Sequence, residues 1–137
     1  MEQVHGGVVA LAGRGLLVLG PAGSGKSTLA LQLMAVGAGL VSDDRTDLRR
    51  RGADLWASCP PALRGLIEAR GVGVLAADAH GPVQIVCAVD LGRGPDDRLP
   101  QSQSVHLCGV PVPLVLGPYR PHLYSALRQL LLAGRAR

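Results

Sequence analysis

The chain has 137 residues, a net charge of +4 and 47% hydrophobic residues, so it can bury one core but is short for two ordinary domains. Aromatic residues make up only 2% and phenylalanine is absent, which leaves Leu, Val, Ile and Ala to build the core. Such residues suit layered α/β packing. We therefore expect one α/β domain over residues 1–137.

The basic residues form no nucleic-acid-binding stripe. They are spread along the chain, apart from the run 49–51 and the C-terminus, and the few aromatic residues are too scattered to stack on bases. Three cysteines without a CxxC pair indicate neither a disulfide framework nor a zinc site. The N-terminus does not resemble a signal peptide, and no apolar run reaches the roughly 18 residues of a membrane span. We expect a cytoplasmic protein without nucleic-acid or membrane partners.

The first half of the chain predicts a strand, a Gly-rich loop, a helix and a second strand. Residues 15–19 are an apolar run that leads into the loop, and the spacing of apolar residues over 26–36 is helical. A short strand at 40–42 then ends in the pair Asp43-Asp44. Ligands of α/β sheets bind at such strand ends.

The second half predicts a short helix, two strand regions and a last helix. Residues 62–69 can form about two helical turns, 83–89 a central strand, and 105–115 a Pro-interrupted edge or bent strand. Pro121 opens the last helix, whose apolar face is either core or a subunit contact; a domain this small favours core. The Gly-, Pro- and Asp-rich segment 92–104 is the expected mobile loop.

The sequence Gly20-Pro21-Ala22-Gly23-Ser24-Gly25-Lys26-Ser27 matches the Walker A pattern GxxxxGK[ST] in its required place between strand and helix. The glycines let consecutive N–H groups face phosphates, and the helix N-terminus adds partial positive charge. Lys26, the only lysine among 14 basic residues, reaches the β/γ oxygens, and Ser27 ligates Mg²⁺. We therefore expect residues 20–28, ending at Thr28, to bind a nucleoside triphosphate.

Five further side chains are candidates for chemistry. Asp43 and Asp44 can hold Mg²⁺ as Walker B carboxylates do, although they also suit a helix cap or a solvated turn. Adjacent strand residues point in opposite directions, so a local bend is needed to bring both into one site. Asp44 and His5 are candidate bases for a hydroxyl, with a surface role open for His5. Glu68 and Arg70 are either a metal contact and a charge clamp or the wet face of the short helix.

The order and spacing of four stretches resemble the catalytic domain of the HPr kinase/phosphorylase family: His5-Gly6, the Walker A loop, residues 40–47 and residues 64–73. The resemblance covers His5 to about Arg120. It implies a P-loop domain of phosphoenolpyruvate carboxykinase-like type, with a sheet packed with helices. It also implies an ATP- and Mg²⁺-dependent kinase of a serine in HPr, a phosphocarrier protein of the phosphotransferase system, with phosphorolysis as the reverse activity.

The resemblance also implies roles for individual residues. Asp44 becomes the proton acceptor, supported by His5 and Lys26, and Ser27 and Glu68 become Mg²⁺ ligands. The stretch Asp97-Arg98-Leu99 marks Arg98 as a catalytic arginine on a mobile loop. For assembly, the resemblance implies a homo-oligomer, a hexamer in the family, and a short form without the family's N-terminal domain.

Departures from the family pattern leave two alternatives open. Thr28 stands where the family usually has Glu, Pro100 replaces a glycine, and 75–82 is shorter than its counterpart. These changes suit a nucleotide-binding regulatory module with weak or no phosphotransfer. A small-molecule kinase is the third hypothesis, ranked last because no second Gly-hinged lid is evident.

Overall fold

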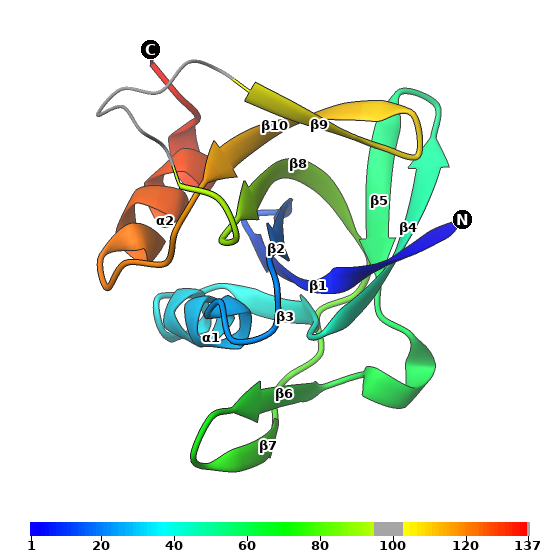
Figure 1. The fold of residues 1–137 in the computed structure, drawn as a ribbon. Coiled ribbons are helices and arrows are strands. Elements are labelled where there is room, and N and C mark those ends of the chain that lie inside the picture. The colour runs from blue at the N-terminus through cyan, green and yellow to red at the C-terminus, as the bar shows by residue number, and fades with distance from the viewer. Residues whose placement is uncertain (95–102, 137) are drawn as a thin grey trace.

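The computed structural model describes residues 1–94 and 103–136 and has a mixed α/β architecture (Figure 1). Two helices, α1 (Lys26–Ala35) and α2 (Leu123–Ala133), and one 3₁₀ turn, η1 (Pro61–Leu63), accompany the strands. The strands are β1 (Glu2–Leu11), β2 (Arg14–Leu19), β3 (Gly39–Ser42), β4 (Arg45–Arg51), β5 (Asp54–Ser58), β6 (Leu66–Ala69), β7 (Gly73–Ala76), β8 (Val83–Asp90), β9 (Gln103–Leu107) and β10 (Val110–Leu116).

The main sheet closes on itself through part of its length. Its strand order is β2-β1-β4-β5-β8-β10-β9, β3 pairs with β1, and β2 also pairs with β8. The pairings therefore form a circuit that runs from β2 through β1, β4, β5 and β8 back to β2. Only β2–β8 and β8–β10 are parallel pairs. As a result β2, which leads into the Gly-rich loop, has a partner strand on each side.

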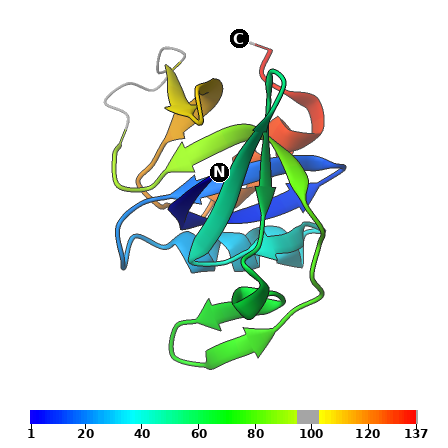
Figure 2. The same cartoon turned by 90° about the vertical axis from the view of Figure 1, so that its right-hand side faces the viewer.

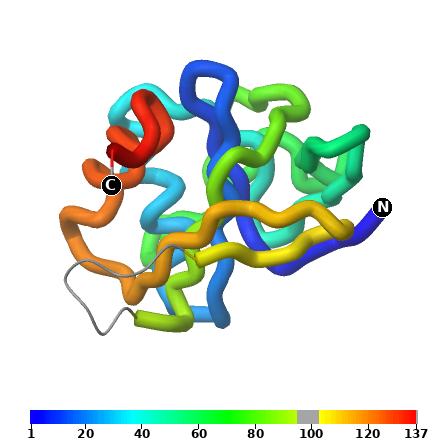
Figure 3. The backbone as a smooth tube through the Cα atoms, turned by 90° about the horizontal axis from the view of Figure 1, so that it is seen from above, coloured from blue at the N-terminus to red at the C-terminus, as the bar shows by residue number. Residues whose placement is uncertain are grey.

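Each face of the sheet carries its own hydrophobic cluster. Leu16 and Val18 of β2 pack in the cluster with the helices, whereas Leu17 between them points into the second cluster with β4 and β5. A strand buried on both faces needs a continuous apolar run, which explains the unbroken sequence at 15–19. Figure 2 shows α1 beneath the sheet, and Figure 3 shows the N- and C-terminal ends on opposite sides of the molecule.

The predicted helices are present. α1 ends at Ala35, one residue before the end of the expected segment 26–36, and α2 begins at Leu123, two residues after Pro121. Leu123, Leu127 and Leu131 of α2 are buried within this chain. They complete the cluster that also contains Leu29 and Leu33 of α1, so this face of α2 is core. No helix in the described ranges is long and apolar enough to cross a membrane.

The prediction of a helix over 62–69 is wrong. The segment forms only the turn η1, and residues 66–69 are strand β6, paired with β7 in a separate hairpin. Burial alternates along the strand: Ile67 and Ala69 are buried, and Leu66 and Glu68 are exposed. Four residues are too few to distinguish this period from a helical one. Glu68 therefore lies on a strand, in a hairpin that projects below the main sheet (Figures 1 and 2).

The region 105–115 is a hairpin rather than one bent strand. Cys108 and Gly109 form its two-residue turn with φ values of 51° and 75°, the signature of a type I′ turn. The prediction of a mobile loop at 92–104 falls mainly on 95–102, outside the described residues.

Burial raises the pKa of the Cys87 thiol on β8 to about 11 from an ordinary value of 9.0. Between these values the unfolded chain has lost this proton while the folded chain keeps it, so the free energy of unfolding should fall as pH rises from 9 to 11. We expect Cys87→Ala to flatten this part of the profile relative to the parent chain. Denaturant unfolding at pH 8, 9, 10 and 11 measures the difference, and parallel profiles for parent and Cys87→Ala would contradict it.

Candidate functional site

The Gly-rich loop between β2 and α1 depends on glycine at two positions. Gly20 has a φ of 147°, and a Cβ there would lie 2.6 Å from the Ser24 hydroxyl oxygen. Gly25 has a φ of 102° and is the N-cap of α1, and a Cβ there would lie 3.1 Å from the Tyr119 ring. Left-handed φ and close approach together exclude larger residues. The loop thus leaves the free N–H groups of the first turn of α1 facing outward, where an anion can bind them.

A cavity of about 380 Å³ opens beside this loop. Its lining consists of Ala22, Gly23, Gly25, Lys26, Ser27, Thr28, Asp44, Glu68 and Arg70. Segments that are far apart in the sequence therefore meet here: the loop and α1, the end of β3, and the β6–β7 hairpin. The Lys26 ammonium lies across the loop and donates to the carbonyl oxygens of Gly20 at 2.6 Å and Pro21 at 3.1 Å.

Asp43 connects the loop, β3 and β6. Its Oδ1 accepts a hydrogen bond from the Ser27 hydroxyl at 2.8 Å, and its Oδ2 accepts one from the Glu68 backbone N–H at 3.0 Å. The side chain is 8% exposed. A buried carboxylate needs such donors, so Asp43 fixes Ser27 and places Glu68 at the cavity wall.

Asp44 turns toward the cavity because the backbone bends sharply at this residue. Its φ is 68°, and the Arg45 N–H donates to the Asp43 carbonyl at 2.8 Å, which closes a three-residue turn. The bend that the sequence required is therefore present: Asp43 is directed at Ser27 and Asp44 lines the cavity.

Five predicted residues within the described ranges do not line the cavity: Gly20, Pro21 and Ser24 of the loop, Asp43 behind Ser27, and His5. His5 is exposed on β1, opposite Arg45, and the following residue, Gly6, donates its N–H to the Asp44 carbonyl at 2.9 Å. His5 is therefore linked to Asp44 only through the backbone. Arg98 lies outside the described residues.

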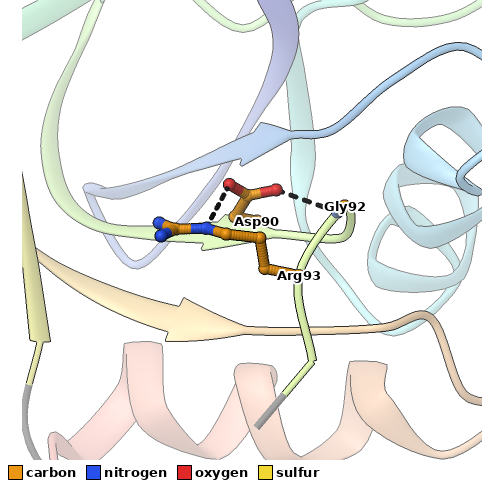
Figure 4. Close-up of polar contacts among 3 residues, drawn as sticks. All are labelled: Asp90, Gly92 and Arg93. Carbon is orange, nitrogen blue, oxygen red and sulfur yellow. Dashed lines mark hydrogen bonds and ion pairs between the residues drawn. The ribbon is translucent and has the colours of Figure 1, made fainter.

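Asp90, at the end of β8, holds a turn against the loop. Its carboxylate accepts from the Gly92 N–H at 2.8 Å and from Arg93 Nε at 3.2 Å (Figure 4). A Cβ on Gly92 would lie 2.8 Å from the Pro21 ring, so the turn packs directly on the loop. The sequence analysis missed Asp90, although a carboxylate that ends an apolar strand is the signal that drew attention to Asp43 and Asp44.

Tyr119 braces the other end of the loop and was also not predicted. Its ring packs on Gly25, and its hydroxyl accepts a hydrogen bond from the Gln32 side chain of α1 at 2.9 Å. Asp90 and Tyr119 thus fix the loop from β8 and from the end of β10.

We expect Tyr119→Phe to lower the free energy of unfolding by about 1 kcal/mol, because the Gln32 amide loses the tyrosine hydroxyl as its hydrogen-bond acceptor while the ring stays in place. This corresponds to a fall of about 4 °C in Tm, measured by thermal unfolding. Tyr124→Phe is the matched control, since Tyr124 packs against the same cluster and makes no side-chain hydrogen bond to a described residue. Equal Tm values for the two variants would show that the Gln32 contact contributes nothing.

A metal would find oxygen donors at this cavity. The Ser27 hydroxyl and the Glu68 carboxylate are at its wall, with Asp43 behind Ser27. Mg²⁺ prefers oxygen ligands and commonly takes only one or two from protein, the others from phosphate and water. The described residues contain no cluster of three His, Cys, Asp or Glu side chains that could hold an ion alone. The donor set therefore fits Mg²⁺ that arrives with a phosphate ligand.

Comparison with known proteins supports the family resemblance that the sequence motifs indicate. Residues 1–88 match the family model described as HPr Serine kinase C-terminal domain. Proteins named HPr kinase/phosphorylase from Burkholderia lata and Burkholderia cenocepacia are each 38% identical over an alignment of 121 residues; the match covers 80% of this chain and 38% of each relative. The chain therefore spans well under half the length of these curated relatives.

A solved structure extends the similarity to nearly the whole fold. The Hpr(Ser) kinase/phosphatase from Coxiella burnetii superposes with a TM-score of 0.84 at 26% sequence identity, covering 96% of this chain and 89% of that one. Together with the family match over residues 1–88, this establishes that the chain belongs to the HPr serine kinase C-terminal domain family.

Proposed function

We propose that this chain is a P-loop kinase domain, of phosphoenolpyruvate carboxykinase-like type, that transfers the γ-phosphoryl group of ATP to a serine of an HPr-like phosphocarrier protein. The observation that carries the proposal is the meeting of Lys26, Ser27, Asp44 and Glu68 at one cavity beside the Gly-rich loop. Phosphoryl transfer requires little beyond such positioning and charge stabilisation.

The loop binds the nucleotide in this proposal. The loop 20–28 binds the phosphates through backbone N–H groups, which Pro21 lacks and which Ser24 already donates to the Pro21 carbonyl, and the Lys26 ammonium turns from the Gly20 and Pro21 carbonyls to the β/γ oxygens. Ser27 and Glu68 would hold Mg²⁺, and Asp43, which accepts a hydrogen bond from the Ser27 hydroxyl, would orient Ser27 and is the third candidate ligand. When bound, Mg²⁺ neutralises charge on the phosphates.

Asp44 is the proposed base. Its carboxylate accepts the proton of the serine hydroxyl as the serine oxygen bonds to the γ-phosphorus and the bond to the β-phosphate oxygen breaks, releasing ADP. In the reverse reaction, an oxygen of inorganic phosphate bonds to the phosphorus of the phosphoserine, the bond to the serine oxygen breaks, pyrophosphate leaves, and Asp44 returns the proton to the serine oxygen. We assign Arg70 at the cavity wall, and Arg98, to charge stabilisation. His5 supports Asp44 from β1.

We also propose the partner and the assembly on the basis of family membership. The acceptor is an HPr-like carrier, and the relatives in both Burkholderia species and in Coxiella burnetii are named for that substrate. The chain is proposed to form a homo-oligomer, which light scattering of the purified chain tests directly.

The decisive experiment incubates the chain with ATP, Mg²⁺ and purified HPr, followed by mass spectrometry for phosphoserine. An HPr variant with the acceptor serine replaced by alanine is the control. Addition of inorganic phosphate to the phosphorylated carrier tests the reverse reaction. Tight ATP binding without formation of phosphoserine would instead support the regulatory-module alternative. A rate of ATP turnover that does not change when HPr is added would support a small-molecule kinase.

A further inference from the structure

A second cavity, of about 450 Å³, lies away from the Gly-rich loop between the β8–β10 part of the sheet and α2. Its walls are mostly apolar, with Val86 from β8, Leu114 from β10 and Leu130 from α2 among them. It shares no lining residue with the nucleotide cavity. Its volume is in the range of small-molecule sites.

The cavity exists because β8 and β10 separate. The two strands pair only from Leu114 to Leu116, opposite Ala88 to Asp90. In the β9–β10 hairpin, residue pairs that exchange backbone hydrogen bonds alternate with pairs that do not, counting from the turn. Pro111 and Pro113 belong to the pairs that do not, so their backbone faces away from β9 and toward β8. Proline has no N–H to donate there, so the ladder cannot extend. Both prolines line the resulting gap, so the cavity is a consequence of proline at these two positions.

Charge at this cavity has one sign. Arg14, the first residue of β2, and Arg135, after α2, lie among its lining residues, which include no carboxylate. Within the described ranges the only ion pair is Arg93–Asp90, so neither guanidinium is neutralised by a described carboxylate. Arg135 is near enough to the Cys87 thiol to lower its pKa, against the larger effect of burial. An apolar wall with two arginines and no acid selects a particular kind of ligand.

We propose that this cavity binds a small molecule with an apolar body and an anionic group, the body against Val86, Leu114 and Leu130 and the anion between Arg14 and Arg135. Apolar contact supplies most of the affinity, and the arginines supply the preference for an anion. The site is separate from phosphotransfer and does not depend on the function proposed above.

A pair of fluorescent probes tests the charge preference. 1-Anilinonaphthalene-8-sulfonate carries a sulfonate, and N-phenyl-1-naphthylamine is the same ring system without it. We expect the sulfonate probe to bind at one site per chain, and Arg14→Gln and Arg135→Gln each to weaken it by about five- to tenfold. The neutral probe should change by less than about twofold in the same variants, since only the charged contact is lost. Equal effects on both probes, or none on the sulfonate probe, would overturn the proposal.

Two further variants locate the binding. Ser104→Trp places a large side chain at an exposed lining position of β9 and should abolish binding of both probes. His106→Trp is the matched control, because His106 is exposed on the same face of β9 but does not line the cavity. Lys26→Ala should leave probe binding unchanged, and a loss there would assign the probe to the nucleotide site instead. Sedimentation completes the test: self-association that Ser104→Trp abolishes would make the cavity a contact between chains and reject the ligand proposal.

Discussion

Lys26→Ala is expected to lower the rate of phosphoserine formation by about 10²–10³-fold, the cost of removing one charge-stabilising donor at a reacting centre. Lys26 lines the cavity and is the only lysine of the chain, so no other lysine can substitute for it. Its ammonium already reaches the first carbonyls of the loop, which places it within a short movement of bound phosphates. Initial rates with saturating HPr measure the effect.

Lys26→Arg is the control for this experiment. It keeps the charge but spreads it over a planar group that fits the loop less well, so we expect activity between that of the parent and that of Lys26→Ala. Both variants should unfold within about 2 °C of the parent, because the two loop contacts are partly exposed. A Lys26→Ala enzyme with more than about a tenth of parent activity would show that the loop binds something other than a reacting phosphate.

Asp44→Asn is expected to lower the rate by about 10²–10⁴-fold while ATP binding and Tm stay unchanged, because the amide cannot accept the serine proton. The choice of asparagine follows from the backbone. Asp44 has a φ of 68°, and Asn is among the few residues that tolerate this region. The variant thus changes the chemistry without straining the turn, which Asp44→Ala would not achieve.

Asp43→Asn makes the comparison sharp. Asp43 accepts from both Ser27 and the Glu68 N–H, and an amide has only one acceptor oxygen for these two donors. We expect this variant to lose stability as well as activity. If Asp44→Asn lost Tm to the same extent, Asp44 would be a structural residue and another group would have to act as the base.

The local parts of the fold could be predicted from the sequence because each has a short-range cause. The strand 15–19, the loop and α1 follow from an apolar run, glycines and a helical spacing. β4 was missed because only Thr46 and Leu48 of its seven residues are buried, and its arginines hide the alternation. The closure of β2 onto β8 could not be predicted from the sequence, because the two strands are far apart in the chain. The first pair of their ladder joins Arg14 to Gln84, about 70 positions later.

The candidate site divides in the same way. The loop residues, Asp43, Asp44 and Glu68 could be named from pattern and family resemblance. Their contacts could not, because the Ser27–Asp43 and Glu68–Asp43 hydrogen bonds join separate elements. Tyr119 packs on Gly25, and Asp90 holds the Gly92 turn that packs on Pro21; the sequence marks Asp90 as a carboxylate at a strand end but carries no signal for either packing contact.

The closed circuit of strands makes one wall of the cavity beside the Gly-rich loop stiffer than the other. β2 has a ladder on both flanks up to Leu19, so its amides should exchange with deuterium only when the whole chain unfolds. In the β6–β7 hairpin the two strands differ: Ile67 of β6 is buried in the core and the Glu68 N–H is bonded to Asp43, whereas every residue of β7 is exposed, so the β7 amides should exchange through local opening. The molecule would then hold both the Gly-rich loop and Glu68 in place. Adjustment to a bound partner would come from β7 and from the turn that carries Arg70.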